Sequence, residues 1–282
     1  MVKVAIQLYS VREEMAKDPV STIEKVARTG YRYLEVANHN TAQDTGIGFG
    51  ISADKMKGML DRLGVQVISA HLDPFDNLDA LSDYQLTIGN RNVVYSRDFY
   101  HNRQEVLDRA YWMNKTGEAC AKRGLTLYYH NHFHEFLKFG DETIFDILLA
   151  HMDPDLVKIQ LDTFWVLRGG VDPVALMRRL GKRVTLVHQK DYAKGYDDEM
   201  DLTQKVRPGE YIDRSFYDRH ENPETFVEIG TGIMDIQAII DAGLDSGGLE
   251  YIILEQDHSR LNQLESIKIS KMGFEKFSGI AW

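Results

Sequence analysis

The chain has 282 residues, 43% of them hydrophobic, and a formal net charge of -10. This length fits one large α/β barrel or two ordinary domains, and the apolar and aromatic content excludes a disordered chain. The acidic balance argues against a nucleic-acid partner, and no stretch approaches the roughly 18 apolar residues of a membrane span. Because Met1 leads straight into an expected strand without a leader pattern, we expect a cytoplasmic protein.

Eight short runs of β-branched and aromatic residues indicate buried strands, at 3–9, 31–37, 65–71, 92–96, 125–131, 157–161, 184–190 and 251–255. Helical patterns alternate with them at 19–29, 53–63, 78–88, 103–123, 142–151, 172–180, 234–242 and 261–272. This alternation predicts an α/β fold, a (β/α)8 TIM barrel that forms a single domain over residues 1–282. An open doubly wound sheet is the alternative, weakened because no G-x-G-x-x-G follows the first strand.

One connection is longer than a barrel requires. Residues 192–226 follow the seventh expected strand, are rich in charge and tyrosine, and have no sustained helical or strand period. Loops of this length inside compact domains are usually lids, binding loops or disordered segments. Since TIM barrels carry their chemistry at the C-terminal face, we expect this segment to be a lid, with a solvated insertion as the alternative.

Four acidic or imidazole side chains stand near the ends of the last four expected strands: Glu135, Asp162, His188 and Glu255. If all strands end on one rim, these groups converge, and three carboxylates beside an imidazole repel one another unless a cation binds. The sequence therefore predicts one divalent metal ion at these residues, Mn²⁺ first, with Co²⁺, Mg²⁺ or Zn²⁺ as alternatives. Singly, each residue has a structural alternative as a helix cap, a buried histidine or an ion-pair partner.

Other polar side chains on the same rim are candidates for substrate contact. His130, His132 and His134 alternate along an extended segment, so they form either a second metal site or, as we expect for His130 and His132, part of the substrate pocket. Simple structural roles are the alternative for the remaining candidates, which are Gln7 in the first strand, Glu35 and His71 closing the second and third, and Lys190 after His188.

Six motifs in barrel order carry a family likeness, at 7–12, 128–136, 161–173, 187–191, 230–232 and 253–257. In these the chain resembles the xylose isomerase-like barrels of the sugar phosphate isomerase/epimerase group, related to ketose 3-epimerases and inosose dehydratases. The resemblance implies that the four residues above are metal ligands and that Glu135 and Glu255 are also the catalytic acid/base pair, on opposite faces of a sugar. Where the epimerases commonly have a histidine, this chain has Trp165, which implies a different or bulkier substrate in contact with Trp165.

We therefore expect a divalent-metal-dependent isomerase or epimerase that acts on a keto-sugar or sugar derivative through an enediolate. One alternative is a lyase, which either dehydrates an inosose or cleaves a carbon-carbon bond of a 3-keto C-glycoside with a small partner subunit. Another is a non-catalytic sugar-binding barrel. An apurinic-site endonuclease would need more metal ligands and a positive groove, which this acidic chain does not show. A homo-oligomer is expected only from the family.

Overall fold

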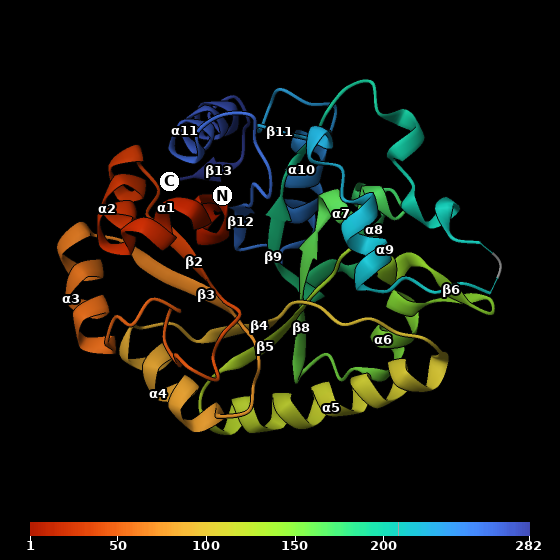
Figure 1. Cartoon of the computed structure of the whole chain (residues 1–282), viewed down its shortest axis with the longest axis horizontal. Coiled ribbons are helices and arrows are strands. Elements are labelled where there is room, and N and C mark those ends of the chain that lie inside the picture. Colours follow the sequence, from red (N-terminus) through yellow and green to blue (C-terminus); the bar gives the residue numbers. More distant parts are fainter. Residues whose placement is uncertain (208) are drawn as a thin grey trace.

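The computed structural model describes residues 1–207 and 209–282 (Figure 1). Eight parallel strands form its centre: β1 (Val2–Gln7), β2 (Tyr33–Asn38), β3 (Gln66–Leu72), β4 (Asn92–Tyr95), β5 (Thr126–His130), β8 (Val157–Asp162), β9 (Val184–Gln189) and β12 (Tyr251–Leu254). The pairing of β1 with β12, in register from Lys3 opposite Tyr251, closes the sheet. An open sheet has no such pairing, so the predicted TIM barrel is confirmed.

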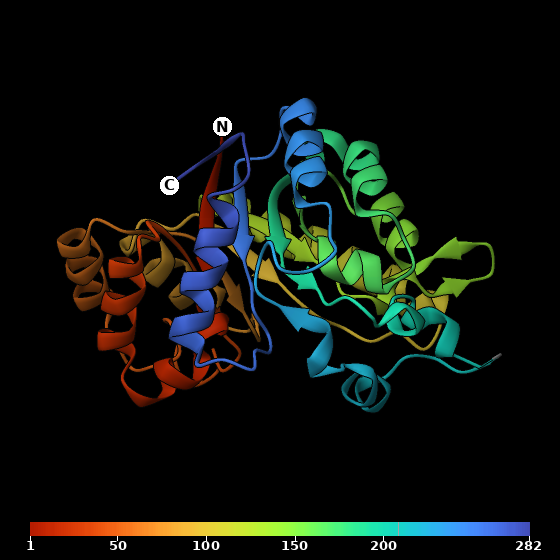
Figure 2. The same cartoon turned by 90° about the horizontal axis from the view of Figure 1, so that it is seen from above.

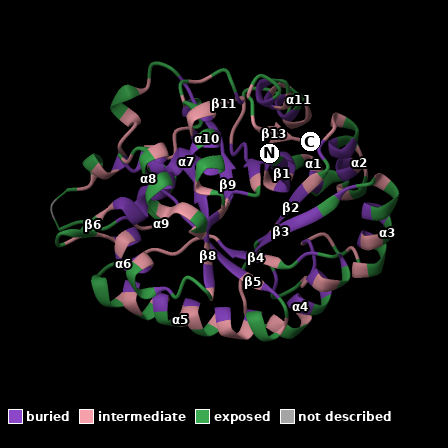
Figure 3. Ribbon diagram, turned by 180° about the vertical axis from the view of Figure 1, so that it is seen from behind, coloured by how far each residue is buried: buried purple, intermediate pink, exposed green. Residues whose placement is uncertain are grey.

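The helices surround this barrel with their buried faces inward (Figure 3). The eight expected helices are all present within a few residues: α2 (Pro19–Thr29), α3 (Ala53–Leu63), α4 (Leu78–Thr87), α5 (Arg103–Lys122), α6 (Ile144–His151), α8 (Pro173–Leu180), α10 (Ile236–Ser246) and α11 (Gln263–Phe274). The short helices α1 (Arg12–Lys17), α7 (Thr163–Arg168) and α9 (Arg214–His220) were not predicted. Among the described residues, no helix is both long and apolar enough to cross a membrane.

Local chemistry explains where these elements begin and end. Asp18 accepts a hydrogen bond from the Ser21 N–H at the start of α2, and Pro19 occupies the first helical position, where it loses no hydrogen bond. Gly30 ends the helix with φ +113°, in the left-handed region that favours glycine. Near the C-terminus, β13 (Ile280–Ala281) pairs with the start of β1, so the two termini lie side by side (Figures 1 and 2).

The barrel interior has an apolar layer beneath a polar one. Six strands each contribute one residue to a buried apolar cluster: Ala5, Ile68, Val94, Tyr128, Leu186 and Ile253. Because side chains alternate along a strand, the residue two positions later faces the interior again, closer to the C-terminal rim. In five of these six cases that residue, in the strand or directly after its end, is polar: Gln7, Ser96, His130, His188 and Glu255. The polar layer is therefore placed by the same period of two that builds the core.

The long connection after β9 is a packed structure on the side of the barrel where the strands end (Figure 2). Its two ends meet where β10 (Asp191–Tyr192) pairs antiparallel with β11 (Phe226–Val227). Between them, α9 was missed in the sequence because seven residues carry too little periodicity. The connection packs on a buried cluster that includes Phe133, Phe164, Trp165, Leu202, Ile212, Phe216 and Tyr217. It is therefore held by an apolar interface of its own.

Arg168, at the end of α7, ties this connection to the barrel. Its side chain is fully buried, and the guanidinium donates to Thr225 Oγ1 at 2.8 Å and to the His220 carbonyl at 3.1 Å. The charge also lies 5.6–5.9 Å from the ring centroids of Phe164, Trp165 and Tyr192. Because His220 is the last residue of α9, Arg168 fixes that helix relative to the strand ends.

Candidate metal centre and active-site cavity

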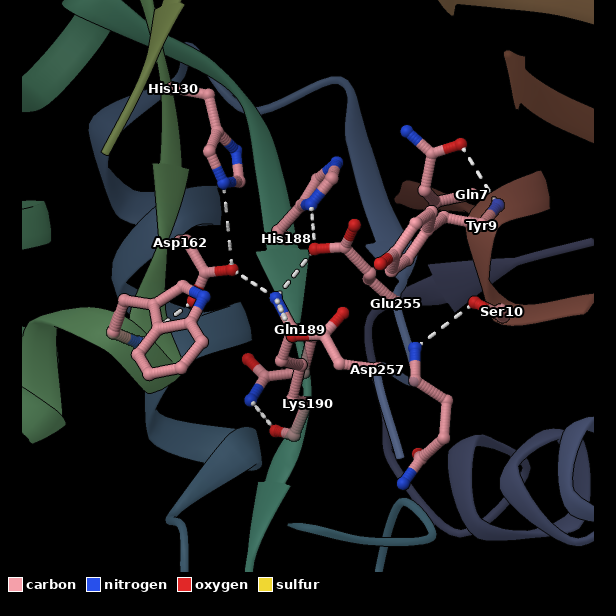
Figure 4. Close-up of polar contacts among 12 residues, drawn as sticks. Gln7, Tyr9, Ser10, His130, Asp162, His188, Gln189, Lys190, Glu255 and Asp257 are labelled. Carbon is pink, nitrogen blue, oxygen red and sulfur yellow. Dashed lines mark hydrogen bonds and ion pairs between the residues drawn. The ribbon is translucent and has the colours of Figure 1, made fainter. Parts of the chain in front are cut away.

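Four buried side chains at consecutive strand ends form a group of possible metal ligands (Figure 4). They are His130, Asp162, His188 and Glu255, and one ligand atom from each lies within 4.8 Å of those from the others. Strand register explains the convergence, since Asp162 is opposite His188 across β8 and β9 and the Glu255 N–H donates to the Gln189 carbonyl at 3.2 Å. Three of the four expected ligands are therefore brought together.

Glu135, the fourth expected ligand and one of the expected catalytic pair, lies outside this group. It stands in a short 3-10 turn, five residues after β5 ends. Its buried carboxylate accepts a hydrogen bond from the Tyr129 hydroxyl at 2.6 Å and another from the His132 N–H at 3.0 Å. His130, expected to contact substrate, takes its place because it is the last residue of β5 and faces the barrel interior.

The hydrogen bonds of His130 prepare its ring to bind a cation. Its Nδ1 lies 3.0 Å from Gln160 Oε1, an oxygen that can only accept, so this nitrogen carries the proton. The bare Nε2 then faces Asp162 Oδ2 at 3.9 Å. Burial, together with His188 and His71, lowers the pKa of His130 well below its usual value. A neutral imidazole fixed by a second hydrogen bond is the usual form of a metal-binding histidine.

His188 lies between two carboxylates. Its Nδ1 is 2.8 Å from Glu255 Oε2, and its Nε2 contacts Glu35 Oε1. Burial opposes a charged ring, but Glu35 and Glu255 outweigh it and raise the pKa of His188 to about 10. A divalent ion at the Nδ1 side would take the place of the Nδ1 proton, leaving Glu35 as the carboxylate that orients the ring.

Glu35 contacts the ligand group through His188 and is itself held by three hydrogen-bond donors. Its buried carboxylate accepts hydrogen bonds from Gln7 Nε2 at 2.9 Å, Ser69 Oγ at 2.5 Å and Gln160 Nε2 at 2.5 Å. Burial disfavours its charge, yet His188 and His71 hold the pKa of Glu35 well below its usual value. Glu35 was expected to contact substrate, but it does not line the cavity described below.

Lys190 Nζ lies among the carboxylates of the ligand group (Figure 4). It contacts Asp162 Oδ2, lies 2.5 Å from Glu255 Oε2 and 3.6 Å from Asp257 Oδ2, and is fully buried. Burial disfavours the ammonium, but these carboxylates raise the pKa of Lys190 above its usual value. Lys190 was predicted as a substrate contact, but it too is not among the residues that line the cavity.

Asp162 combines two roles that the sequence left as alternatives. Its Oδ1 accepts a hydrogen bond from the Trp165 N–H at 2.8 Å and so caps α7, while its Oδ2 faces Lys190 and His130. Burial raises the pKa of Asp162, although Lys190 opposes the shift. The cap fixes the carboxylate plane, which leaves one oxygen directed at the ligand group.

A cavity of about 100 Å³ opens beside the ligand group. Five expected substrate contacts line it, namely Gln7, His71, His130, His132 and Trp165, together with Glu255. Sequence reasoning missed Tyr9, His39, Arg97, Tyr217, Glu221 and Asp257. Four of these, Tyr9, His39, Arg97 and Asp257, follow β1, β2, β4 and β12 by at most three residues, which is a usable signal. Tyr217 and Glu221 come from the long connection, where no strand end marks them.

Two carboxyl groups that follow β12, Glu255 and Asp257, differ in the direction of their pKa shifts. Burial opposes the charge of Glu255, but Lys190 and His188 hold its pKa well below the usual value. Burial raises the pKa of Asp257 well above its usual value, and Glu255 adds to the shift against the opposing effect of Lys190. One cavity wall therefore carries two carboxyl groups whose pKa values are shifted in opposite directions, a pattern typical of acid/base sites.

The donor set fits a divalent ion. Bonds of about 2.1 Å place opposite ligands about 4.2 Å apart, within the 4.8 Å span of these four atoms. Two imidazole nitrogens and two carboxylate oxygens form a common set for catalytic transition-metal sites. A second group, His71, His130 and His188, shares two histidines with the first, so the described residues provide for one ion rather than two.

Two curated relatives are named inosose dehydratase. The protein from Clostridium beijerinckii is 27% identical over 272 residues, covering 86% of this chain and 84% of the relative. The protein from Lactiplantibacillus plantarum is 29% identical over 160 residues, but that match covers 56% of this chain and only about half, 49%, of the relative.

Solved structures and a family model place the fold. A sugar phosphate isomerase/epimerase from Parabacteroides distasonis matches 99% of this chain and 94% of its own, with a TM-score of 0.74 and 22% identity. The IolI protein, solved with a zinc atom, matches 98% of this chain and 100% of its own, with a TM-score of 0.69 and 13% identity. The model described as xylose isomerase-like TIM barrel matches residues 23–273. With most of its length matched in this way, the chain belongs to the xylose isomerase-like TIM barrel family.

Proposed function

We propose that this protein is a divalent-metal-dependent lyase that removes water from a cyclic keto-polyol of the inosose type. The relatives named inosose dehydratase support this reaction class. The observation that carries the proposal is the placement of the carboxyl groups: Glu255 and Asp257 line one cavity, and Glu135 does not. Epimerisation between two glutamates needs both on the substrate, whereas elimination needs one base and one acid near adjacent carbons.

The metal ion would be held by His130, Asp162, His188 and Glu255, and when bound it supplies a Lewis acid that polarises the substrate carbonyl. The sequence predicted three oxygen ligands and one nitrogen, but the structure groups two of each. This change favours Zn²⁺ or Co²⁺ at least as much as the expected Mn²⁺. Zinc in the IolI protein is consistent with that preference.

In the proposed reaction, Glu255 accepts the proton from the carbon next to the carbonyl. Asp257 donates its carboxyl proton to the hydroxyl on the following carbon, which leaves as water. The proton on Glu255 then returns to Asp257, so both groups regain their starting states. His132 supports substrate contact, because among the described residues its buried Nδ1 has no hydrogen-bond partner and the ring lines the cavity.

We also propose that residues 192–226 act as a lid. The cavity of about 100 Å³ is well below the roughly 300 Å³ at which small-molecule pockets usually begin. Tyr217 and Glu221, from the end of α9 and the residue after it, form part of its wall. Outward movement of this helix would admit a polyol ring, and its return would exclude water from the reacting groups.

Product analysis tests the proposal. Metal-loaded protein should convert an inosose in D₂O into a product that has lost one water. Mass spectrometry and NMR monitor the reaction. Asp257→Asn should abolish this conversion while metal content is retained, and Asp245→Asn, at an exposed position, should leave it unchanged. An isomer of unchanged composition that carries solvent deuterium would instead show the epimerase expected from the sequence, and binding without turnover would show a sugar-binding barrel.

A further inference from the structure

The ammonium of Lys190 lies where the proposed metal ion would bind. Nζ contacts Asp162 Oδ2 and is 2.5 Å from Glu255 Oε2 (Figure 4). Asp162 and Glu255 are two of the four members of the ligand group. An ion coordinated by these two carboxylates and an ammonium touching both would occupy the same space and repel each other. Lys190 and the ion are therefore alternative occupants.

Without a metal ion, the two carboxylates of the ligand group need another cation, and Lys190 supplies it. Asp162 and Glu255 are buried carboxylates directed at the same point, and buried charges without a partner strongly destabilise a fold. The fully buried Lys190 supplies the cation that holds them together. The ammonium neutralises the two carboxylates when no metal is bound. Once an ion binds, the ammonium is an additional positive charge at the same place.

We propose that Lys190 is a built-in counter-cation, which holds the ligand carboxylates together until a divalent ion binds and displaces it. The inference rests on the proposed metal function. The displaced ammonium can donate a hydrogen bond to a carboxyl oxygen of Asp257, since Oδ2 is only 3.6 Å from Nζ and the Asp257 side chain lines the cavity. Metal binding thereby moves Lys190 from the ligand group to the cavity wall, where it can donate to a substrate oxygen.

Calorimetric titration with Zn²⁺ or Mn²⁺ alone tests this exchange. Lys190→Met and Lys190→Gln should bind the ion at least about tenfold more tightly than the unmodified protein, because no ammonium has to be displaced. The same variants should melt at a lower temperature without metal and recover at saturating metal. Lys194→Met, at an exposed lysine four residues along the chain, should change neither the affinity nor the melting temperature.

A measurement on the unmodified protein does not depend on how the variants fold. Acetylation of Lys190 by acetic anhydride, followed by mass spectrometry, should be slow without metal and faster at saturating metal, while Lys194 reacts equally in both states. Equal or weaker metal affinity in the Lys190 variants, or an acetylation rate at Lys190 that metal does not raise, would overturn the exchange. If neither protein binds metal, the proposed metal function itself fails, and displacement fails with it.

Discussion

Exchanging His130 and Glu135 for glutamine separately tests which of them is a ligand of the proposed metal ion. His130→Gln removes one of the four grouped ligand atoms. Loss of a side chain that only orients a metal ligand already weakens binding by about 10–100-fold, so loss of a ligand should exceed about 100-fold. Glu135→Gln leaves the ligand group intact, and the metal affinity should remain that of the unmodified protein.

The stability of Glu135→Gln should fall even though its metal affinity does not. The carboxylate accepts hydrogen bonds from the Tyr129 hydroxyl and the His132 N–H, and the amide retains only one acceptor oxygen. Loss of one charge-assisted hydrogen bond costs about 1.5–3 kcal/mol. At roughly 2–4 °C per kcal/mol for a domain of this size, Tm should drop by about 3–12 °C.

Calorimetric titration with Zn²⁺ and thermal unfolding in a chelator measure the two effects separately. Asp162→Asn serves as the positive control for metal loss. Glu135→Gln that loses metal as completely as Asp162→Asn would refute the placement of Glu135 outside the centre. So would His130→Gln that keeps its full metal affinity.

Gly58→Ala in α3 should raise the free energy of unfolding by about 1 kcal/mol, because an added Cβ meets open space there. Gly273→Ala in α11 should lower the free energy of unfolding, because its Cβ would collide with the Ile229 carbonyl. Urea unfolding measures both, and equal effects would contradict the close approach of α11. Burial raises the pKa of Cys120 to about 12, so an aromatic disulfide reagent at about pH 8 should label the protein only after unfolding. Arg168→Met should speed protease cutting within 192–226, and cutting at the unmodified rate would show that the buried guanidinium does not anchor this segment.

The barrel was predictable because its signals are local and repeated. Glycines such as Gly64 end helices in the left-handed conformation, and runs such as 65–71 have the length and composition of buried strands. α9 was missed because seven residues carry too little apolar periodicity, although Asp213 caps its start and Arg214 pairs with Asp218 one turn later.

The ligand group was partly predictable for the same reason. Asp162, His188 and Glu255 each end or directly follow a strand, so the sequence located them. After β5, several imidazoles and one carboxylate follow within five residues, and strand composition does not show which of them faces inward. The alternation from Tyr128 in the apolar layer would have selected His130, two residues later, and excluded Glu135 from the strand.

The β10–β11 pair has an evolutionary consequence. It brings together the two ends of a segment that supplies Tyr217 and Glu221 to the cavity, while every proposed metal ligand comes from a strand end outside that segment. The segment is therefore a cassette: another sequence joined at Tyr192 and Phe226 would meet the same two-strand base. A descendant of this chain that exchanged the cassette would change this part of the cavity wall and keep the strand ends that carry the proposed ligands, so the shape of the cavity and the ligand group are free to diverge at different rates.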